Sequence, residues 1–173
     1  MALRLDYRAL LLAVDDIPPG PSDDASEGLL QQAEAAAKER LSKTAFGAFR
    51  NISAWREAYK AFESKPAKYR NSAEPLIRRA EASLPRVNRS TDIDNAISVK
   101  YCIALGGEDL DKYTGAPFCA RATGKEDFSV EAGGETTVEH PDAGGVVWCD
   151  DAGVACRRWN WRQGLRTALA CSS

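Results

Sequence analysis

The chain has 173 residues, of which 44% are apolar and 28% are charged, and its formal net charge is −2. This length supplies one sizeable hydrophobic core and is too short for two full domains. The apolar run at residues 10–14 is far below the roughly 20 residues that a membrane helix needs, and the small net charge excludes a protein that binds nucleic acid over its whole surface.

The cysteine and histidine content limits the chemistry. The five cysteines are odd in number, widely spaced and without a CxxC pair, which favours reduced thiols over a disulfide framework. The one histidine, His140, lies in a segment rich in Gly, Pro and Asp, where we expect a solvated loop residue. A histidine metal site and a Ser-His-Asp triad are therefore not expected, and neither is a cofactor. No cleavage site follows the N-terminal apolar run, so we expect a cytoplasmic protein.

The first half of the sequence predicts four helices. Residues 26–41 are rich in good helix formers, with Ser26 as the expected N-cap. Ser72 is the expected cap of the third helix, and Ser90 or Thr91 of the fourth, where Asp92 and Asp94 would lie at the positive end of the helix dipole. The predicted helices span residues 26–41, 45–63, 71–84 and 90–103.

The second half predicts strands separated by turn residues. The expected strands span residues 117–123, 145–150 and 154–161, and the last two would form a hairpin. Helices followed by strands are typical of an α+β fold with a mostly antiparallel sheet. We therefore expect a helical extension over residues 1–44 and one α+β domain over residues 45–173.

Basic residues gather in one stretch of the chain, with only Glu74 and Glu81 as acids among them. They are Lys65, Lys68, Arg70, Arg78, Arg79, Arg86 and Arg89. Two interpretations stay open. The stretch forms either a local nucleic-acid-binding face or a solvated helical surface with a few ion pairs.

The stretch CRRWNWR, residues 156–162, combines aromatic and basic residues. In an extended strand Trp159 and Trp161 would point to one face. Arg158, Asn160 and Arg162 would point to the other. The tryptophan face is expected in the core, and the polar face is either a solvated rim or a contact for phosphate or a polar ligand.

A second group of polar residues surrounds the Gly106-Gly107 pair. Asp92, Asp94 and Asn95 come from the predicted fourth helix, and Asp109 and Asp111 follow the glycines; together they would line a pocket. Four carboxylates also suggest a magnesium site. Because aspartate is a common capping residue at helix starts, we do not expect a metal.

Three segments, in this order, resemble a known family: YRNSAEPLIRR, LPRVNRSTDIDNAISVKYCIALGGEDLDKYTG and VVWCDDAGVACRRWNWR. They are similar to the free-standing relatives of the B3/B4 editing module in the β subunit of phenylalanyl-tRNA synthetase, over residues 46–167. The resemblance implies a layered α+β domain whose partner is aminoacylated tRNA and which hydrolyses mischarged aminoacyl-tRNA in trans. The alternatives are a non-catalytic tRNA- or RNA-binding module and an inactive, truncated remnant.

The resemblance, together with the polar and basic patterns described above, gives candidate site residues. Asp94 stands where the synthetase module has a pocket threonine, and Gly106 where it has a histidine; Asp94 would orient the attacking water. Substrate binding is assigned to Asp92, Asn95, Gly106, Gly107, Arg158 and Asn160. Nucleic-acid binding is assigned to Arg70, Arg78, Arg79, Arg157 and Arg162. The module's tyrosine-reading glutamate belongs to a strand beyond the WNWR region, so we expect a C-terminally truncated or divergent domain.

Overall fold

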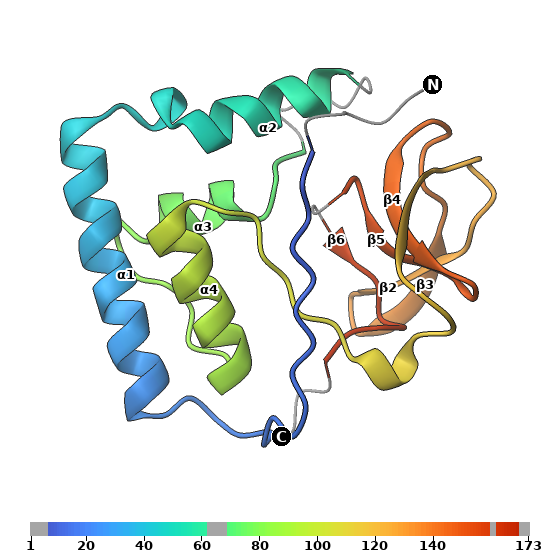
Figure 1. Cartoon of the computed structure of the whole chain (residues 1–173), viewed down its shortest axis with the longest axis horizontal. Helices are drawn as coiled ribbons and strands as arrows, with labels where there is room; N and C mark the ends of the chain where they lie inside the picture. Colours follow the sequence, from blue (N-terminus) through green and yellow to red (C-terminus); the bar gives the residue numbers. More distant parts are fainter. Residues whose placement is uncertain (1–6, 62–68, 160–161, 170–173) are drawn as a thin grey trace.

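The computed structural model describes residues 7–61, 69–159 and 162–169, with the helices on one side of the molecule and the strands on the other (Figure 1). The helices are α1 (Asp24–Lys43), α2 (Arg50–Ala61), α3 (Ala73–Arg79) and α4 (Arg89–Tyr101). Two short 3-10 turns are η1 (Phe46–Ala48) and η2 (Leu110–Lys112). Each of the four predicted helices is present, and the α+β class is confirmed.

Ser72 is the N-cap residue of α3, as predicted, but its side chain makes no capping hydrogen bond. The caps of α1 and α4 lie two or three residues before the predicted ones. Asp23 caps α1 by accepting a hydrogen bond from the Ser26 backbone N–H at 2.8 Å. Ser26 is the third helical residue and returns the bond to the Asp23 N–H at 3.0 Å, which completes a capping box. Asn88 caps α4 in the same way, through the Thr91 N–H at 2.8 Å. The sequence-based prediction named serine or threonine at these positions. Because aspartate, asparagine, serine and threonine all cap helices well, the residue type alone does not identify the cap.

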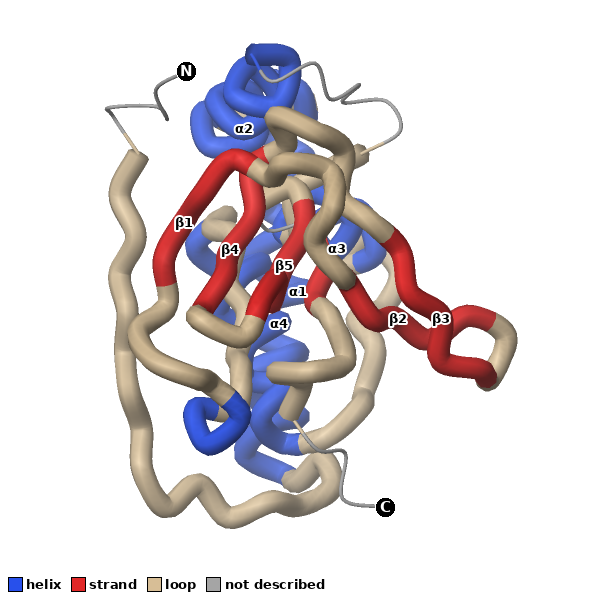
Figure 2. Tube along the Cα trace, turned by 90° about the vertical axis from the view of Figure 1, so that its right-hand side faces the viewer, coloured by secondary structure: helices blue, strands red, loops and turns tan. Residues whose placement is uncertain are grey.

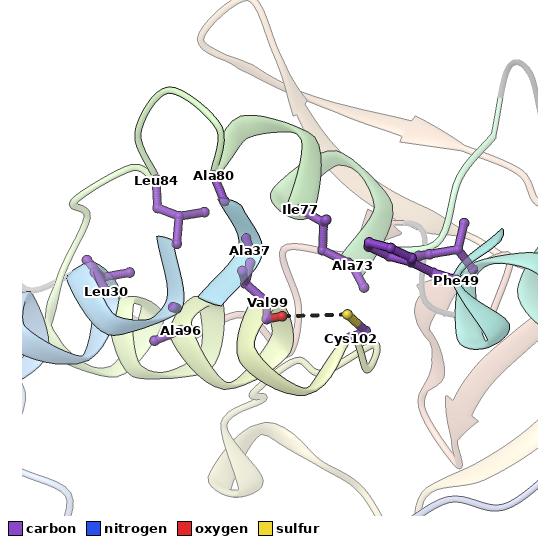
Figure 3. Packing of buried hydrophobic residues seen from close by; sticks show 12 residues of the cluster. Leu30, Ala37, Phe49, Ala73, Ile77, Ala80, Leu84, Ala96, Val99 and Cys102 are labelled. Atoms are coloured by element: carbon purple, nitrogen blue, oxygen red, sulfur yellow. Dashed lines mark hydrogen bonds between the residues drawn. The ribbon is translucent and has the colours of Figure 1, made fainter. Parts of the chain in front are cut away.

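Helix α1 belongs to the same hydrophobic core as α3 and α4. Its Leu30, Ala33 and Ala37 are buried, and they pack in one cluster with Ala96 and Val99 of α4 (Figure 3). Alanines at the contact let the two helix backbones approach closely. Helix α1, which lies in the predicted N-terminal extension, therefore contributes to the core of the helical layer.

The strands form two antiparallel sheets. The larger one has the order β1-β4-β5-β6, and the hairpin β2-β3 projects from it (Figure 2). Their bounds are β1 (Phe118–Arg121), β2 (Phe128–Ala132), β3 (Glu135–Glu139), β4 (Val146–Asp150), β5 (Gly153–Arg157) and β6 (Arg162–Gln163). The β2-β3 hairpin was not predicted from the sequence.

The larger sheet buries side chains on both faces. On one face Val147 and Val154 pack with Phe128 of β2. On the other face Cys119, Trp148 and Cys156 are directly opposed across three strands, so their side chains share that face. The second face carries the aromatic cluster that joins the sheet to α2, with Tyr7, Trp55 and Trp159 as further members.

The predicted strand over residues 154–161 is wrong at residues 158 and 159, since β5 ends at Arg157. Arg158 and Trp159 have positive φ angles of 48° and 71°, so the chain turns there and side-chain alternation stops. The Tyr59 hydroxyl donates to the Arg158 carbonyl oxygen at 2.7 Å and holds this turn. Trp159 is buried, as expected, with 2% exposure. Asn160 and Trp161 lie outside the described residues.

Within the described ranges, no helix combines the length and the apolar character that crossing a membrane requires.

Candidate functional site

Asp94 and the glycine pair, predicted to share a pocket, lie together in the structure. A Cβ atom placed on Gly107 would come within 3.1 Å of the Asp94 Oδ2 atom and 3.2 Å of the Leu169 Cδ1 atom. A larger residue at position 107 would therefore crowd the carboxylate. Gly106 has open space around it, so the close approach is a property of Gly107 alone.

The Asp94 carboxylate is half-buried and makes no hydrogen bond within the described part of the chain. Burial raises the pKa of this carboxyl group above its usual value. A carboxylate that is partly removed from water and lacks a donor is costly for the folded protein. Such a group is a candidate for binding a ligand or for taking a proton.

The C-terminal segment of the described chain holds the glycine loop in place. The Gln163 side-chain amide donates to the Gly107 carbonyl oxygen at 2.8 Å. The Asp109 N–H donates to the Thr167 carbonyl oxygen at 3.0 Å. Among the described residues, neither the Gly106 N–H nor the Gly107 N–H donates a backbone hydrogen bond.

The Cys119 and Cys156 thiols of the larger sheet have raised pKa values. Burial, together with the negative charge of Glu108, raises the pKa of Cys156 to about 12. Burial likewise raises the pKa of Cys119 to about 11. Both thiols are therefore protonated at neutral pH, and the thiolate is the nucleophilic form.

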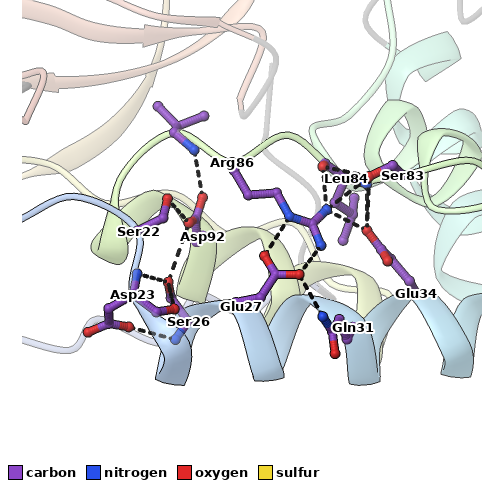
Figure 4. A network of polar contacts seen from close by, with 11 residues as sticks. Ser22, Asp23, Ser26, Glu27, Gln31, Glu34, Ser83, Leu84, Arg86 and Asp92 are labelled. Carbon is purple, nitrogen blue, oxygen red and sulfur yellow. Dashed lines mark hydrogen bonds and ion pairs between the residues drawn. The ribbon is translucent and has the colours of Figure 1, made fainter.

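Asp92, predicted to bind substrate, has a structural place instead. Its side chain is fully buried and accepts bonds from the Ser22 hydroxyl at 2.5 Å, the Val87 N–H at 2.9 Å and the Ser26 hydroxyl at 3.4 Å (Figure 4). These bonds tie the start of α1 to the start of α4. We therefore correct the assignment of Asp92, which fastens two helices together and does not face the glycine loop.

Replacement of Asp92 by alanine should lower the free energy of unfolding by about 2 kcal/mol or more, because it leaves the Val87 N–H and the Ser22 hydroxyl without their acceptor. Urea denaturation followed by circular dichroism measures the change. Alanine at the exposed Asp111 is the matched control and should stay within about 0.5 kcal/mol of the wild type. Equal stability of the two variants would contradict the structural role.

The other predicted substrate residues are less well placed. Asn95 is half-buried and follows Asp94 on α4, so its side chain leaves the helix about 100° away from that of Asp94. Arg158 is buried, pairs with Asp142 and stacks on the Tyr69 ring, 3.5 Å from the ring centroid. Arg158 therefore anchors its turn and has no free face for a substrate.

Arg157 and Arg162, predicted to contact nucleic acid, share one acid. Both pair with Glu139, and the Arg162 distance is 3.1 Å. The two arginines are directly opposed across β5 and β6, which explains why one carboxylate reaches both. The prediction that Arg158 and Arg162 share a polar face opposite Trp159 fails because the backbone turns at residue 158.

The basic stretch is divided between two environments. Arg86 pairs with Glu27 and Glu34 of α1, both at 2.7 Å, and this lowers the pKa of Glu27 to about 2 (Figure 4). Arg89 pairs with Asp23. The ion-pair interpretation therefore holds for the end of the stretch. Lys65 and Lys68 lie outside the described residues.

Arg70, Arg78 and Arg79 remain exposed on the surface around α3. The first two lie beside the buried Glu74. The side chains of these arginines are thus accessible to a partner, unlike those of Arg157 and Arg158.

The fold and the site define a class: an α+β domain whose helical layer and antiparallel sheet meet beside a glycine loop and a half-buried carboxylate. The family model described as B3/4 domain matches residues 54–173. Since this match spans more than half of the chain, the protein belongs to the B3/4 domain family. At the level of the family, this membership fits tRNA binding or an editing-like function. No curated protein and no solved structure matches the chain.

Two side-chain contacts beside the glycine pair were not predicted. Gln163 holds the glycine loop from 56 positions away, and no pattern in the sequence signals that contact. The Tyr113 hydroxyl donates to Glu108, directly after the glycine pair, and the position of this acid next to Gly107 was an available signal. Among the described residues, no group of three or more His, Cys, Asp or Glu side chains is arranged to hold a metal ion.

Proposed function

We propose that this protein binds aminoacylated tRNA and hydrolyses the ester of mischarged molecules in trans, in the cytoplasm. The observation that carries the proposal is the half-buried Asp94 carboxylate, without a donor among the described residues, beside Gly107 in a B3/4 domain. The likeness of three sequence segments to the editing module of phenylalanyl-tRNA synthetase supports the reaction type.

In the proposed reaction, water attacks the ester carbonyl carbon that joins the amino acid to the terminal ribose. Asp94 orients the water and accepts a proton from it as the new bond forms. The N–H groups of Gly106 and Gly107 stabilise the negative charge that develops on the carbonyl oxygen. As the bond between the carbonyl carbon and the ribose oxygen breaks, Asp94 gives its proton to that oxygen, and the products are the free amino acid and uncharged tRNA.

Two departures from the synthetase module bear on specificity. Asp94 replaces a pocket threonine, and Gly106 replaces a histidine, so the proposed pocket has a carboxylate and extra space where the synthetase has a hydroxyl and an imidazole. We therefore propose a different amino acid from the tyrosine that the synthetase removes.

A panel of correctly charged and mischarged aminoacyl-tRNAs tests the function. Purified protein is incubated with each member, and loss of the ester is followed by acid precipitation of labelled amino acid. Accelerated loss of at least one member over buffer is expected. No acceleration with any member would contradict the hydrolysis.

The second candidate is a tRNA-binding module without catalysis. The exposed arginines of α3 favour it, since they can contact phosphates whether or not the ester is cleaved. A binding module would hold charged and uncharged tRNA with equal affinity and leave the ester intact, and filter binding of both forms separates the two candidates.

A further inference from the structure

Three arginines converge on one buried carboxylate between α2 and α3. Glu74 is 1% exposed, and both of its oxygens accept bonds from Arg56, at 2.6 and 3.1 Å. Arg78 approaches the Oε1 atom at 3.4 Å and Arg70 at 3.6 Å. We name Arg56, Arg70, Arg78 and Glu74 the Glu74 cluster. Arg56 already satisfies the carboxylate, so the other two arginines are held near it by longer contacts.

The charges of the Glu74 cluster do not balance. One carboxylate faces three guanidinium groups, and the side chains of Arg70 and Arg78 are 46% and 50% exposed. The contrast with Arg86 is informative, because there the chain supplies two carboxylates to one arginine. Two positive charges at the cluster are left for solvent or for a partner.

An aromatic ring holds two arginines of the cluster in place. The Arg78 guanidinium lies over the Phe46 ring at 4.2 Å from its centroid, and that of Arg56 at 5.6 Å. At the start of α3, the Asn71 side-chain oxygen accepts a bond from the Ala73 N–H at 3.0 Å. An arginine stacked on an aromatic ring and anchored by a carboxylate loses less conformational freedom when it binds an anion.

We infer that the Glu74 cluster is a phosphate-binding site and that its occupant is the phosphodiester backbone of the RNA partner. The forked donors of guanidinium groups match phosphate oxygens in pairs, which ammonium groups do not. Glu74 does not face the phosphate. It positions the arginines, and Arg70 and Arg78 make the contacts. This inference deepens the proposed tRNA binding and is independent of the hydrolysis.

The double variant Arg70→Gln and Arg78→Gln tests the site. The control is the double variant Lys38→Gln and Lys125→Gln, which loses the same charge on exposed surfaces of α1 and of the loop before β2. Binding of a transcribed tRNA is measured by fluorescence anisotropy at several salt concentrations. The arginine variant should bind about tenfold more weakly, and the slope of log affinity against log salt should fall by about two units. The lysine variant should change neither quantity by more than half as much.

Inorganic phosphate supplies a second readout that needs no RNA. At constant ionic strength, replacing chloride by phosphate should raise the Tm of the wild type and of the lysine variant, and should leave that of the arginine variant unchanged. If the double arginine variant does not fold, the single variant Arg70→Gln replaces it, since Arg70 makes the longest contact to Glu74.

The outcomes separate this inference from the hydrolysis. Loss of RNA binding and of the phosphate effect in the arginine variant supports the site, even where no aminoacyl-tRNA is hydrolysed. Equal binding by the two double variants, or an equal phosphate effect, overturns the site, even where hydrolysis is found.

Discussion

Replacement of Asp94 by asparagine is expected to slow ester hydrolysis by at least about 10²-fold, the contribution typical of a positioned acid or base. Asparagine keeps the size of the side chain beside Gly107 and removes its ability to accept a proton. The half-buried position of Asp94 and its lack of a hydrogen-bond donor among the described residues carry this expectation. Single-turnover loss of labelled amino acid from tRNA measures the rate.

The same variant should be at least as stable as the wild type at neutral pH. Burial raises the folded-state pKa of Asp94, so its charged form costs folding free energy above that pKa and the cost disappears as the pH falls through it. The neutral amide removes the cost at all pH values. Hydrolysis by the wild type should decline over the same acidic range, because the proton acceptor is lost.

Asparagine at Asp127, whose side chain is 79% exposed, is the matched control for both measurements and should change neither rate nor stability. Full activity of the Asp94 variant would remove Asp94 from the mechanism. A variant that is both inactive and strongly destabilised would indicate a structural carboxylate.

Replacement of Trp159 by alanine is expected to give the largest loss of stability, about 3–5 kcal/mol. Trp159 is 2% exposed, and its ring lies 4.6 Å from Tyr7 and 5.2 Å from Trp55, between centroids. The cluster joins the sheet to α2 and to the N-terminal segment, so its loss leaves a cavity between the two layers.

Urea denaturation measures this loss, and alanine at Tyr101, an aromatic residue that is 60% exposed, is the control, with an expected change within about 0.5 kcal/mol. A loss below about 1 kcal/mol for the Trp159 variant would contradict its place as the buried centre of the cluster.

Trp159 also shows how far sequence periodicity predicts this fold. Its burial was predicted, because tryptophan at an alternating position is typical of a core. The prediction of an arginine face opposite Trp159 was wrong. Alternation of side chains requires an extended chain, and residues 158 and 159 have positive φ angles. Neither residue is a glycine, so the sequence carried no turn signal at that point.

The β2-β3 hairpin, which was not predicted, has a turn signal in the sequence but no alternating pattern in its second strand. Gly133 and Gly134 have φ angles of 65° and 83°, the conformation of a two-residue hairpin turn that glycine pairs favour. However, every residue of β3 from Glu135 to Val138 is exposed, so β3 lacks the alternation of apolar and polar residues that identifies a strand.

The candidate site was predicted in part. The sequence placed Asp94 near the glycine pair, and the structure brings Asp94 and Gly107 together. The prediction also grouped Asp92 with Asp94 and the glycines. Side chains two positions apart on a helix point in nearly opposite directions, and Asp92 contacts Ser26 of α1. The hydrogen bond from Gln163 to the Gly107 carbonyl oxygen joins residues 56 positions apart. It depends on tertiary packing, so no local sequence pattern predicts it.

The most direct test of the proposed hydrolysis is ester loss from aminoacyl-tRNA under an excess of protein, compared with buffer and with the Asp94→Asn variant. At least one aminoacyl-tRNA is expected to lose its amino acid faster with the wild type, and the variant is expected to bind the same tRNA without accelerating the loss. Equal rates with wild type, variant and buffer across the whole panel would contradict the hydrolysis.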